Sequence, residues 1–216
     1  MRKDIMSETG KGIEITKGDE RVINSQNGIT IRHEAKPVGD EIIGYAYLVI
    51  DCSLSMSEGE KIDQVKNGAK RFTIEAKTKG YLVGLITFNS SATHLCEPQK
   101  EISALYRHLE SMGAWGSTNM TDAILLATEN LIKKNGVRVM VIATDGMPDN
   151  QFTALEAAQE TKKNGIEIIV IGTDDANQDF LKKLASSAGL GFKVSRTQLG
   201  QAVASAAKML LSKRGG

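Results

Sequence analysis

Four runs of apolar residues set the pattern of this chain, at 45–50, 81–88, 137–143 and 166–171. None of them alternates between apolar and polar positions, as a strand with one face in solvent would. Strands that are covered by helices on both faces have such continuous runs, and this is typical of parallel sheets. The pattern therefore predicts a central sheet of buried strands.

Between these runs the apolar positions recur at helical spacing. The clearest stripe has apolar residues three or four positions apart, at Ile62, Val65, Ala69, Phe72 and Ala76. Ser57 followed by Glu60 has the form of a capping box, so we expect this helix to begin at Ser57. Further stripes include Ile124, Ala127 and Leu131; Phe152, Leu155 and Ala158; Phe180 and Leu184; and Leu199, Val203, Ala206 and Leu210 in a last helix over 197–213.

The alternation of strands and helices over residues 42–213 predicts the fold class. It indicates an α/β domain with a doubly wound, mostly parallel central sheet flanked by helices, similar to a Rossmann fold. The segment 87–99 has short strand character and is expected to add one antiparallel edge strand.

The N-terminal residues 1–41 form a separate extension in this interpretation. Apolar residues alternate weakly with polar ones there, and Asn27-Gly28 is a turn signal. Two alternatives stay open: a small β-hairpin that covers an edge of the sheet, or a disordered tail. Residues 214–216 are expected to be a flexible tail, ending in Gly215-Gly216.

Composition narrows the classes of function. The hydrophobic fraction of 41% and charged fraction of 25% are ordinary for a globular protein. A net charge of +1 and an aromatic fraction of 5% argue against direct binding to nucleic acid or to acidic membranes. No apolar stretch approaches the roughly 20 residues of a transmembrane helix, and the polar start from Met1 to Gly10 lacks a signal-peptide core. With only two cysteines as well, the chain is expected in the cytoplasm.

Oxygen-bearing side chains gather where two of the predicted strands end. Asp51, Ser53 and Ser55 follow the run 45–50 directly, and Asp145 follows the run 137–143. Because the carboxyl ends of parallel strands meet at one edge of a sheet, these side chains are expected to converge. Carboxylate and hydroxyl oxygens suit Mg²⁺, with Mn²⁺ as an alternative. The loop 116–122, which opens a helix, offers a third source of hydroxyls.

Three motifs in this order carry a resemblance to a known family. The Asp-x-Ser-x-Ser run at 51–55, the Gly-x-Thr loop at 116–118 and the Thr-Asp-Gly run at 144–146 resemble the von Willebrand factor type A (VWA) domain, over about residues 42–213. The resemblance is to the cytoplasmic prokaryotic type. It implies a complete metal-ion-dependent adhesion site (MIDAS), whose metal ligands would be Asp51, Ser53, Ser55, Thr118 and Asp145.

The resemblance implies a non-enzymatic, Mg²⁺-dependent protein–protein interaction module. In such a module the metal binds a Glu or Asp side chain of a partner. Prokaryotic members of the family work beside AAA+ ATPases and related complexes, so a partner of that class is expected here. No nucleic acid or membrane is expected as a partner.

An enzyme is the alternative hypothesis. Asp51 at a strand end also fits a Mg²⁺-dependent phosphatase of the haloacid dehalogenase type, with Asp174-Asp175 as a late acidic pair. That reaction needs a second aspartate two residues after the nucleophile as general acid, and here the position is Ser53. We interpret Asp174-Asp175 instead as helix-capping residues that precede the helix near Asn177. Trp115 is either part of a partner-contacting surface or a residue that packs against a neighbouring loop.

Overall fold

The computed structural model describes residues 14–17, 20–25, 28–32 and 42–211. The chain divides into two compact units, Met1–Val38 and Gly39–Gly216. In the first unit three strands pair in an antiparallel sheet, in the order β1 (Glu14–Lys17), β2 (Glu20–Ser25) and β3 (Gly28–Arg32). Whether this unit covers an edge of the main sheet stays a prediction.

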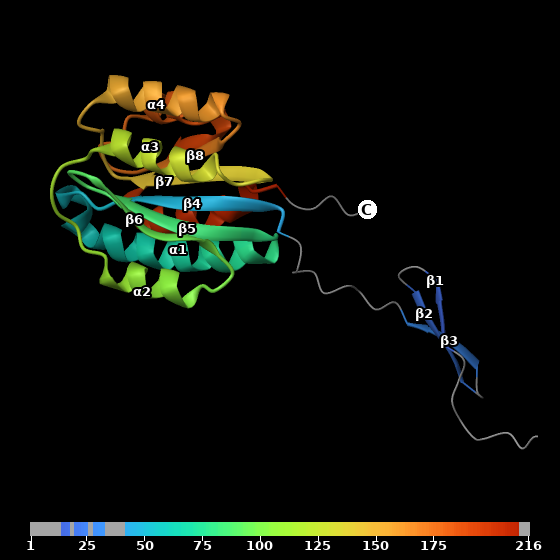
Figure 1. The fold of residues 1–216 in the computed structure, drawn as a ribbon. Coiled ribbons are helices and arrows are strands. Elements are labelled where there is room, and N and C mark those ends of the chain that lie inside the picture. The colour runs from blue at the N-terminus through green and yellow to red at the C-terminus, as the bar shows by residue number, and fades with distance from the viewer. Residues whose placement is uncertain (1–13, 18–19, 26–27, 33–41, 212–216) are drawn as a thin grey trace, which may run out of the picture. The chain divides into compact units, whose positions relative to one another are not determined.

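The second unit is built on a six-stranded sheet with helices on both sides (Figure 1). The strand order is β6-β5-β4-β7-β8-β9, and every pair is parallel except β5 with β6. This confirms the predicted α/β fold with one antiparallel edge strand. The strands are β4 (Gly44–Asp51), β5 (Tyr81–Phe88), β6 (Ala92–Gln99), β7 (Val137–Thr144), β8 (Glu167–Gly172) and β9 (Gly191–Lys193).

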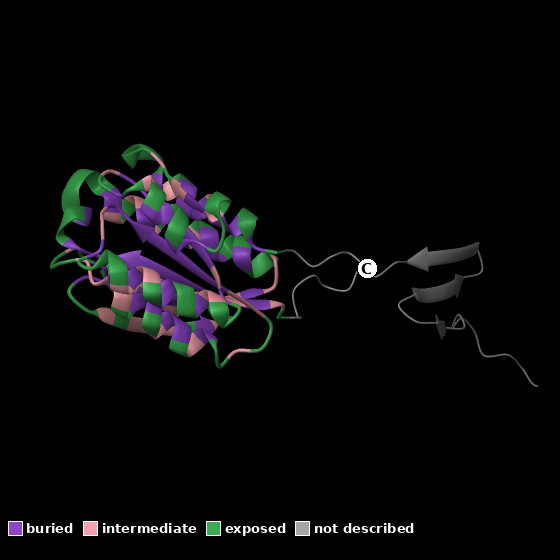
Figure 2. Ribbon diagram, turned by 90° about the horizontal axis from the view of Figure 1, so that it is seen from above, coloured by how far each residue is buried: buried purple, intermediate pink, exposed green. Residues whose placement is uncertain are grey.

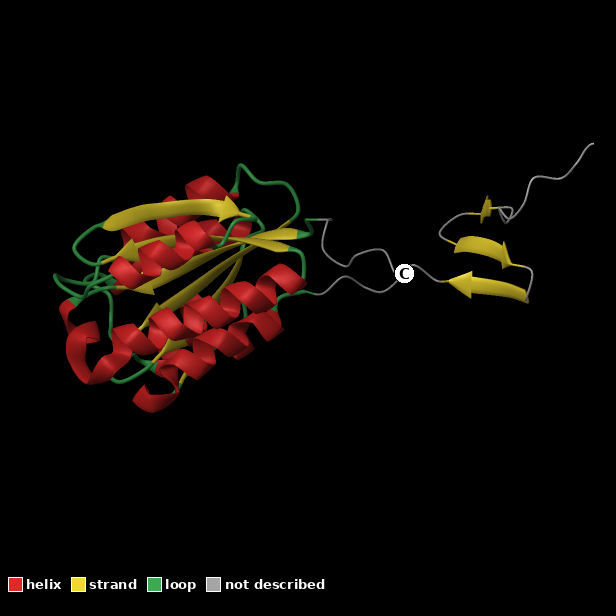
Figure 3. Ribbon diagram, turned by 90° about the horizontal axis from the view of Figure 1, so that it is seen from below, coloured by secondary structure: helices red, strands yellow, loops and turns green. Residues whose placement is uncertain are grey.

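Helices cover both faces of this sheet, as Figure 3 also shows from below. The first face packs against α1 (Lys61–Thr78), α2 (Ser103–Ser111) and α6 (Leu199–Ala206). The second packs against α3 (Met120–Leu131), α4 (Gln151–Lys163) and α5 (Gln178–Leu184). Short 3₁₀ segments are η1 (Leu54–Glu60), η2 (Ala188–Leu190), η3 (Arg196–Gln198) and η4 (Ala207–Met209). No helix within the described residues is long and apolar enough to cross a membrane.

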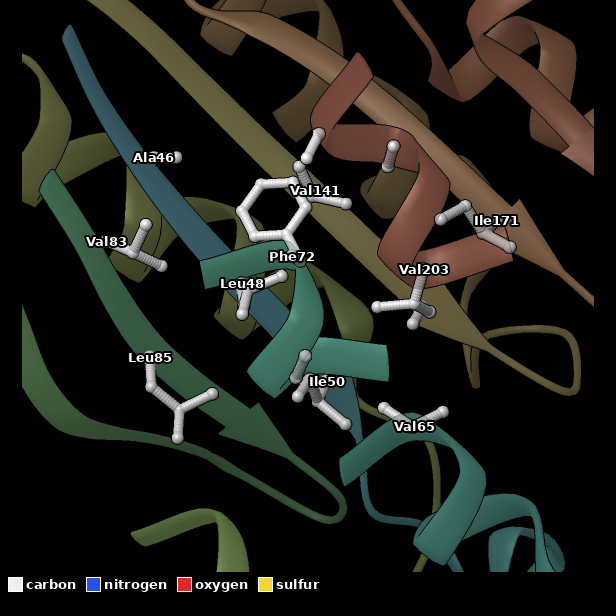
Figure 4. Close-up of a cluster of buried hydrophobic side chains, with 14 of the residues drawn as sticks. Ala46, Leu48, Ile50, Val65, Phe72, Val83, Leu85, Val141, Ile171 and Val203 are labelled. Carbon is white, nitrogen blue, oxygen red and sulfur yellow. The ribbon is translucent and has the colours of Figure 1, made fainter. Parts of the chain in front are cut away.

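Strand β4 shows why its apolar run does not alternate. Leu48 and Ile50 point toward α1 and α6, whereas Tyr47 and Val49 point toward α3 and α4. All four are buried, as are most strand residues in Figure 2. In Figure 4, Leu48 and Val141 from the sheet meet Phe72 of α1 in one cluster. Both faces of the sheet therefore carry a hydrophobic core.

The register of the sheet places the candidate ligands at one edge. Ile50 of β4 pairs with Ala143 of β7, so Asp51 lies beside Thr144 at the carboxyl ends of both strands. The chain leaves β4 through α1 to reach β5 on one side, and it returns through α3 to β7 on the other side. This change of direction makes a topological switch point, where α/β proteins bind their ligands.

The two outermost strands of the sheet are short or irregular. Strand β9 has only three residues. Strand β6 pairs with β5 through two register shifts, and Pro98 lies within it.

Three details differ from the helix predictions. Helix α1 begins at Lys61, not at Ser57, because Gly59 and Glu60 both have left-handed backbone angles and the Ser57 hydroxyl donates to Leu54 instead. Phe152 is 68% exposed, so it lies on the solvent face of α4. The last helix ends at Ala206 and continues only as a 3₁₀ turn, and residues 212–213 lie outside the described part.

Candidate metal centre

Asp51, the last residue of β4, is fully buried and held by two hydrogen bonds. Its Oδ1 accepts from the Ser53 backbone N–H at 2.8 Å, and its Oδ2 accepts from the Thr144 hydroxyl at 2.6 Å. Burial raises the pKa of Asp51 to about 6, although hydrogen bonds from Ser53 and Thr144 act in the opposite direction. The carboxylate is thus fixed in place, and burial makes its negative charge costly without a cation.

Hydroxyl groups connect the loop after β4 with the loop after β7. The Ser53 and Ser55 hydroxyl oxygens lie 3.2 Å apart, and the Ser55 hydroxyl donates to Asp145 Oδ1 at 2.8 Å. Ser53 and Asp145 are buried, whereas Ser55 is exposed. The structure therefore brings together oxygens from the two predicted ligand loops, at the carboxyl ends of β4 and β7.

Thr118 lies in the loop before α3, which hydrogen bonds fasten to both neighbouring loops. Its backbone N–H donates to Asp149 Oδ1 at 3.0 Å, and its carbonyl accepts from the Asp149 N–H at 3.0 Å. The same loop reaches the β4 side, since Trp115 N–H donates to the Cys52 carbonyl at 2.8 Å. Within residues 42–211 the Thr118 hydroxyl makes no hydrogen bond to the other four predicted ligands.

The donor set and its spacing fit a hard divalent cation. Neighbouring oxygens in a Mg²⁺ octahedron with bonds of about 2.1 Å are separated by roughly 3.0 Å. The oxygen separations of 3.2 Å between Ser53 and Ser55 and 2.8 Å between Ser55 and Asp145 match this value. Among the described residues no three His, Cys, Asp or Glu side chains cluster as a metal site. A cation would therefore depend on the serine hydroxyls as much as on the two carboxylates.

The chain that carries these ligand loops matches one known domain family. The model of the von Willebrand factor type A domain matches residues 47–206. The chain belongs to the VWA family. This match gives no support to the haloacid dehalogenase alternative, and VWA domains are generally interaction modules without enzymatic activity. No curated protein sequence matches the chain.

Solved structures share this VWA fold at low sequence identity. The vWF domain of the type V pili tip protein Mfa5 from Porphyromonas gingivalis aligns with a TM-score of 0.73 and 12% identity, over 82% of this chain and 99% of that domain. BatB from Bacteroides thetaiotaomicron aligns with a TM-score of 0.61 and 21% identity, over 76% of this chain and 98% of the other.

A third structure is proximal thread matrix protein 1 from the mussel byssus, with a zinc-occupied MIDAS motif. It aligns with a TM-score of 0.64 and 17% identity, over 79% of this chain and 47% of that one. The present chain thus spans about half of the mussel protein. A divalent metal at a MIDAS motif therefore occurs in a protein of the same fold.

A lysine outside the three VWA motifs, Lys61, contacts the predicted ligand Asp145. The Lys61 ammonium hydrogen-bonds to Asp145 Oδ2, and to Asp174 Oδ2 at 2.9 Å. Burial would lower the pKa of Lys61, but the hydrogen bonds to Asp145 and Asp174 and the attraction of their negative charges together raise it. Arg196 Nε donates to both oxygens of Asp174, at 3.2 Å to Oδ1 and at 2.9 Å to Oδ2, the oxygen that Lys61 also contacts. The charges alternate along this series of four side chains.

Sequence reasoning missed Lys61 and Arg196, and it assigned Asp174 wrongly. Asp174 does not precede a helix as a cap, because the N-cap of α5 is Asn177. Lys61 stands at the first position of α1, where the helix dipole disfavours a cation, but this signal is visible only once the helix start is known to be Lys61 and not Ser57. A lysine there needs a carboxylate partner.

Proposed function

We propose that this VWA domain is a non-enzymatic, metal-dependent module that binds an acidic side chain of a protein partner. The ligands are Asp51, Ser53, Ser55, Thr118 and Asp145, and the cation is Mg²⁺ with Mn²⁺ as an alternative. The observation that carries the proposal is the hydrogen bond from Ser55 to Asp145, because it joins the two ligand loops at the spacing of a metal shell. When bound, the cation would supply an open electrophilic position for a Glu or Asp carboxylate.

The donor chemistry supports a hard cation over zinc. The five proposed ligands are carboxylates and hydroxyls, with no histidine or thiolate among them. Such donors suit Mg²⁺ and Mn²⁺, whereas Zn²⁺ prefers nitrogen and sulfur ligands. Cys52 lies between two of the ligands, but it is buried in the hydrophobic core on the α1 side.

Three exposed apolar side chains around the site support a protein as the partner. Leu54, Trp115 and Phe152 are 63%, 62% and 68% exposed, and we call them the apolar rim. Leu54 stands between Ser53 and Ser55, and its N–H donates to the loop that carries Trp115. Phe152 follows Asp149, whose side chain holds the Thr118 backbone. A partner that presents an acidic residue beside apolar ones would cover all three.

A titration experiment tests the metal site. Isothermal titration of the full chain with MgCl₂ should give one binding event, which Asp51→Ala abolishes. Asp63→Ala is the matched control, since this carboxylate lies on the surface of α1 with 66% of its side chain exposed. Absence of binding to the unmodified chain, or equal binding by Asp51→Ala, contradicts the proposal.

The partner class remains part of the proposal. Cytoplasmic location and an AAA+ ATPase or related complex as partner follow from the family resemblance of the motifs. A pull-down with immobilised protein, in Mg²⁺ and in EDTA, tests partner binding, with Asp51→Ala as the control. Capture that is equal in EDTA would contradict metal-dependent recognition.

A further inference from the structure

We propose that Lys61 is a resident counter-cation of the metal site, which competes with the metal for Asp145 and thereby sets the metal affinity. This inference rests on the proposed function. It adds a residue outside the metal-binding motif, and it assigns to that residue a direction of effect that can be measured.

The backbone before α1 delivers Lys61 to this position. Gly59 and Glu60 have φ angles of 58° and 59°, so the chain turns sharply before the helix begins at Lys61. A β-carbon on Gly59 would lie 2.8 Å from Cδ of Arg196, so the arginine that binds Asp174 also packs against the turn. A left-handed non-glycine residue such as Glu60 costs on the order of 1 kcal/mol and persists only where its surroundings require it. Here the turn directs a lysine inward at a helix start.

Lys61 is a buried cation that has few carboxylate partners other than Asp145. Only 2% of its side chain is exposed, so water cannot replace its carboxylate partners. Its second partner, Asp174, is shared with Arg196, which contacts both carboxylate oxygens. Partial burial would raise the pKa of Asp174, but Arg196 and Lys61 together lower it. Asp174 therefore divides its charge between two cations, and Asp145 is the principal counter-charge left for Lys61.

Asp145 has both carboxylate oxygens engaged in the structure. Oδ1 accepts from Ser55 and Oδ2 accepts from Lys61. A metal that draws on Asp145 must share this charge with the ammonium, and the two cations repel each other in a buried setting. Lys61 thus lowers the affinity for the metal. It also leaves a bound metal more electropositive toward an outside carboxylate, because less protein charge neutralises it.

Lys61→Met and Asp174→Asn both break the ion pair between Lys61 and Asp174. Together they distinguish competition with the metal from a purely structural role of Lys61. Lys61→Met removes the competing charge and keeps an unbranched side chain that is one atom shorter. Asp174→Asn removes the second partner of Lys61 and leaves the ammonium with Asp145 alone. We expect the affinity for Mn²⁺ to rise about tenfold or more in Lys61→Met, and to fall in Asp174→Asn. If Lys61 served only to hold the loop in place, both variants would lose affinity.

The experiment measures Mn²⁺ binding to the full chain by electron paramagnetic resonance, and Mg²⁺ binding by calorimetry. Lys70→Met is the control, because it makes the same charge change on α1 at a residue paired with Glu110. Circular dichroism and thermal unfolding verify that each variant is folded. The control should change the affinity less than about twofold, as distant exposed charges are screened.

The outcomes distinguish this inference from the proposed function. If the unmodified chain binds the metal and Lys61→Met does not bind it more tightly, the inference is overturned and the proposed metal site is not affected. Binding only by Lys61→Met overturns metal dependence of the natural chain, and supports the inference in its strongest form. Binding by neither protein overturns both.

Discussion

The Ser55 hydroxyl donates to Asp145 across 2.8 Å, although the two residues are 90 positions apart in the sequence. Strands β4 and β7 make this possible, because they are neighbours in the sheet and end at the same level. Neither residue could reach the other if β5 lay between the two strands. The strand order of the fold therefore assembles the candidate site.

Metal stabilisation should depend on pH through Asp51. Its pKa is about 6, which is above the ordinary aspartate value near 3.9. The folded state without metal therefore holds this proton more tightly than the unfolded state, and Asp51 contributes less stability as pH rises from about 4 through 6. A metal needs the deprotonated carboxylate. We expect Mg²⁺ to raise the melting temperature more at pH 7.5 than at pH 5, measured by differential scanning calorimetry.

The same measurement on Asp51→Asn provides the control for this pH dependence. The amide does not titrate in this range, so any remaining effect of Mg²⁺ should be small and equal at both pH values. An equal Mg²⁺ effect on the unmodified protein at pH 5 and 7.5 would contradict the role of Asp51.

Removal of Asp145 should destabilise the domain even without metal. Asp145→Ala leaves the buried Lys61 ammonium with Asp174 alone, and breaking a buried ion pair costs on the order of 3 kcal/mol. Adding Lys61→Met should recover part of that loss, because the unpaired charge is gone. Urea unfolding in EDTA measures the free energy of unfolding of both single variants and the double variant. Strictly additive effects would mean that the two residues are not coupled.

Helices α1 and α6 should tolerate no added atom where they cross. A β-carbon on Gly68 of α1 would lie 2.4 Å from the carbonyl oxygen of Gly200, which is backbone and cannot rotate away. Gly68→Ala should therefore lower the free energy of unfolding by about 1–3 kcal/mol. Gly113→Ala is the matched control, because nothing lies within 4 Å of its added carbon. Equal unfolding midpoints for both variants would contradict this close packing.

The apolar rim should matter for partner binding and not for folding. Trp115→Ala and Phe152→Ala remove large exposed side chains beside the site, so we expect reduced Mg²⁺-dependent capture of a partner with the melting temperature nearly unchanged. Ile74→Ala is the control, since Ile74 is 54% exposed on α1. If Ile74→Ala reduces partner capture as much as Trp115→Ala does, the result contradicts a specific role of the apolar rim in binding.

The fold was predictable because its main signal is local. The continuous apolar runs mark strands that are buried on both faces, and four of the six strands of the main sheet follow from them. The edge strand β6 was predicted from the segment 87–99. Strand β9 was missed, since three residues between two 3₁₀ segments give no periodic pattern.

The side chains around Asp145 were harder to predict because they depend on tertiary contacts. Lys61, Asp174 and Arg196 come from three separate segments, and each resembles an ordinary surface charge in the sequence. The capping pattern predicts that α1 starts at Ser57, so the sequence does not show that Lys61 stands at the first helical position. Phe152 fitted a helical stripe, yet the helix turns it to solvent. Periodicity thus located helices better than it located their ends or their faces.

The short strand β9 and the irregular strand β6 limit how this domain can assemble with other chains. Long, regular border strands invite further strands to join through backbone hydrogen bonds, and sheets then grow into aggregates. Here one border offers three residues, and the other carries a proline and two register shifts. Lateral growth of the sheet is blocked at both borders.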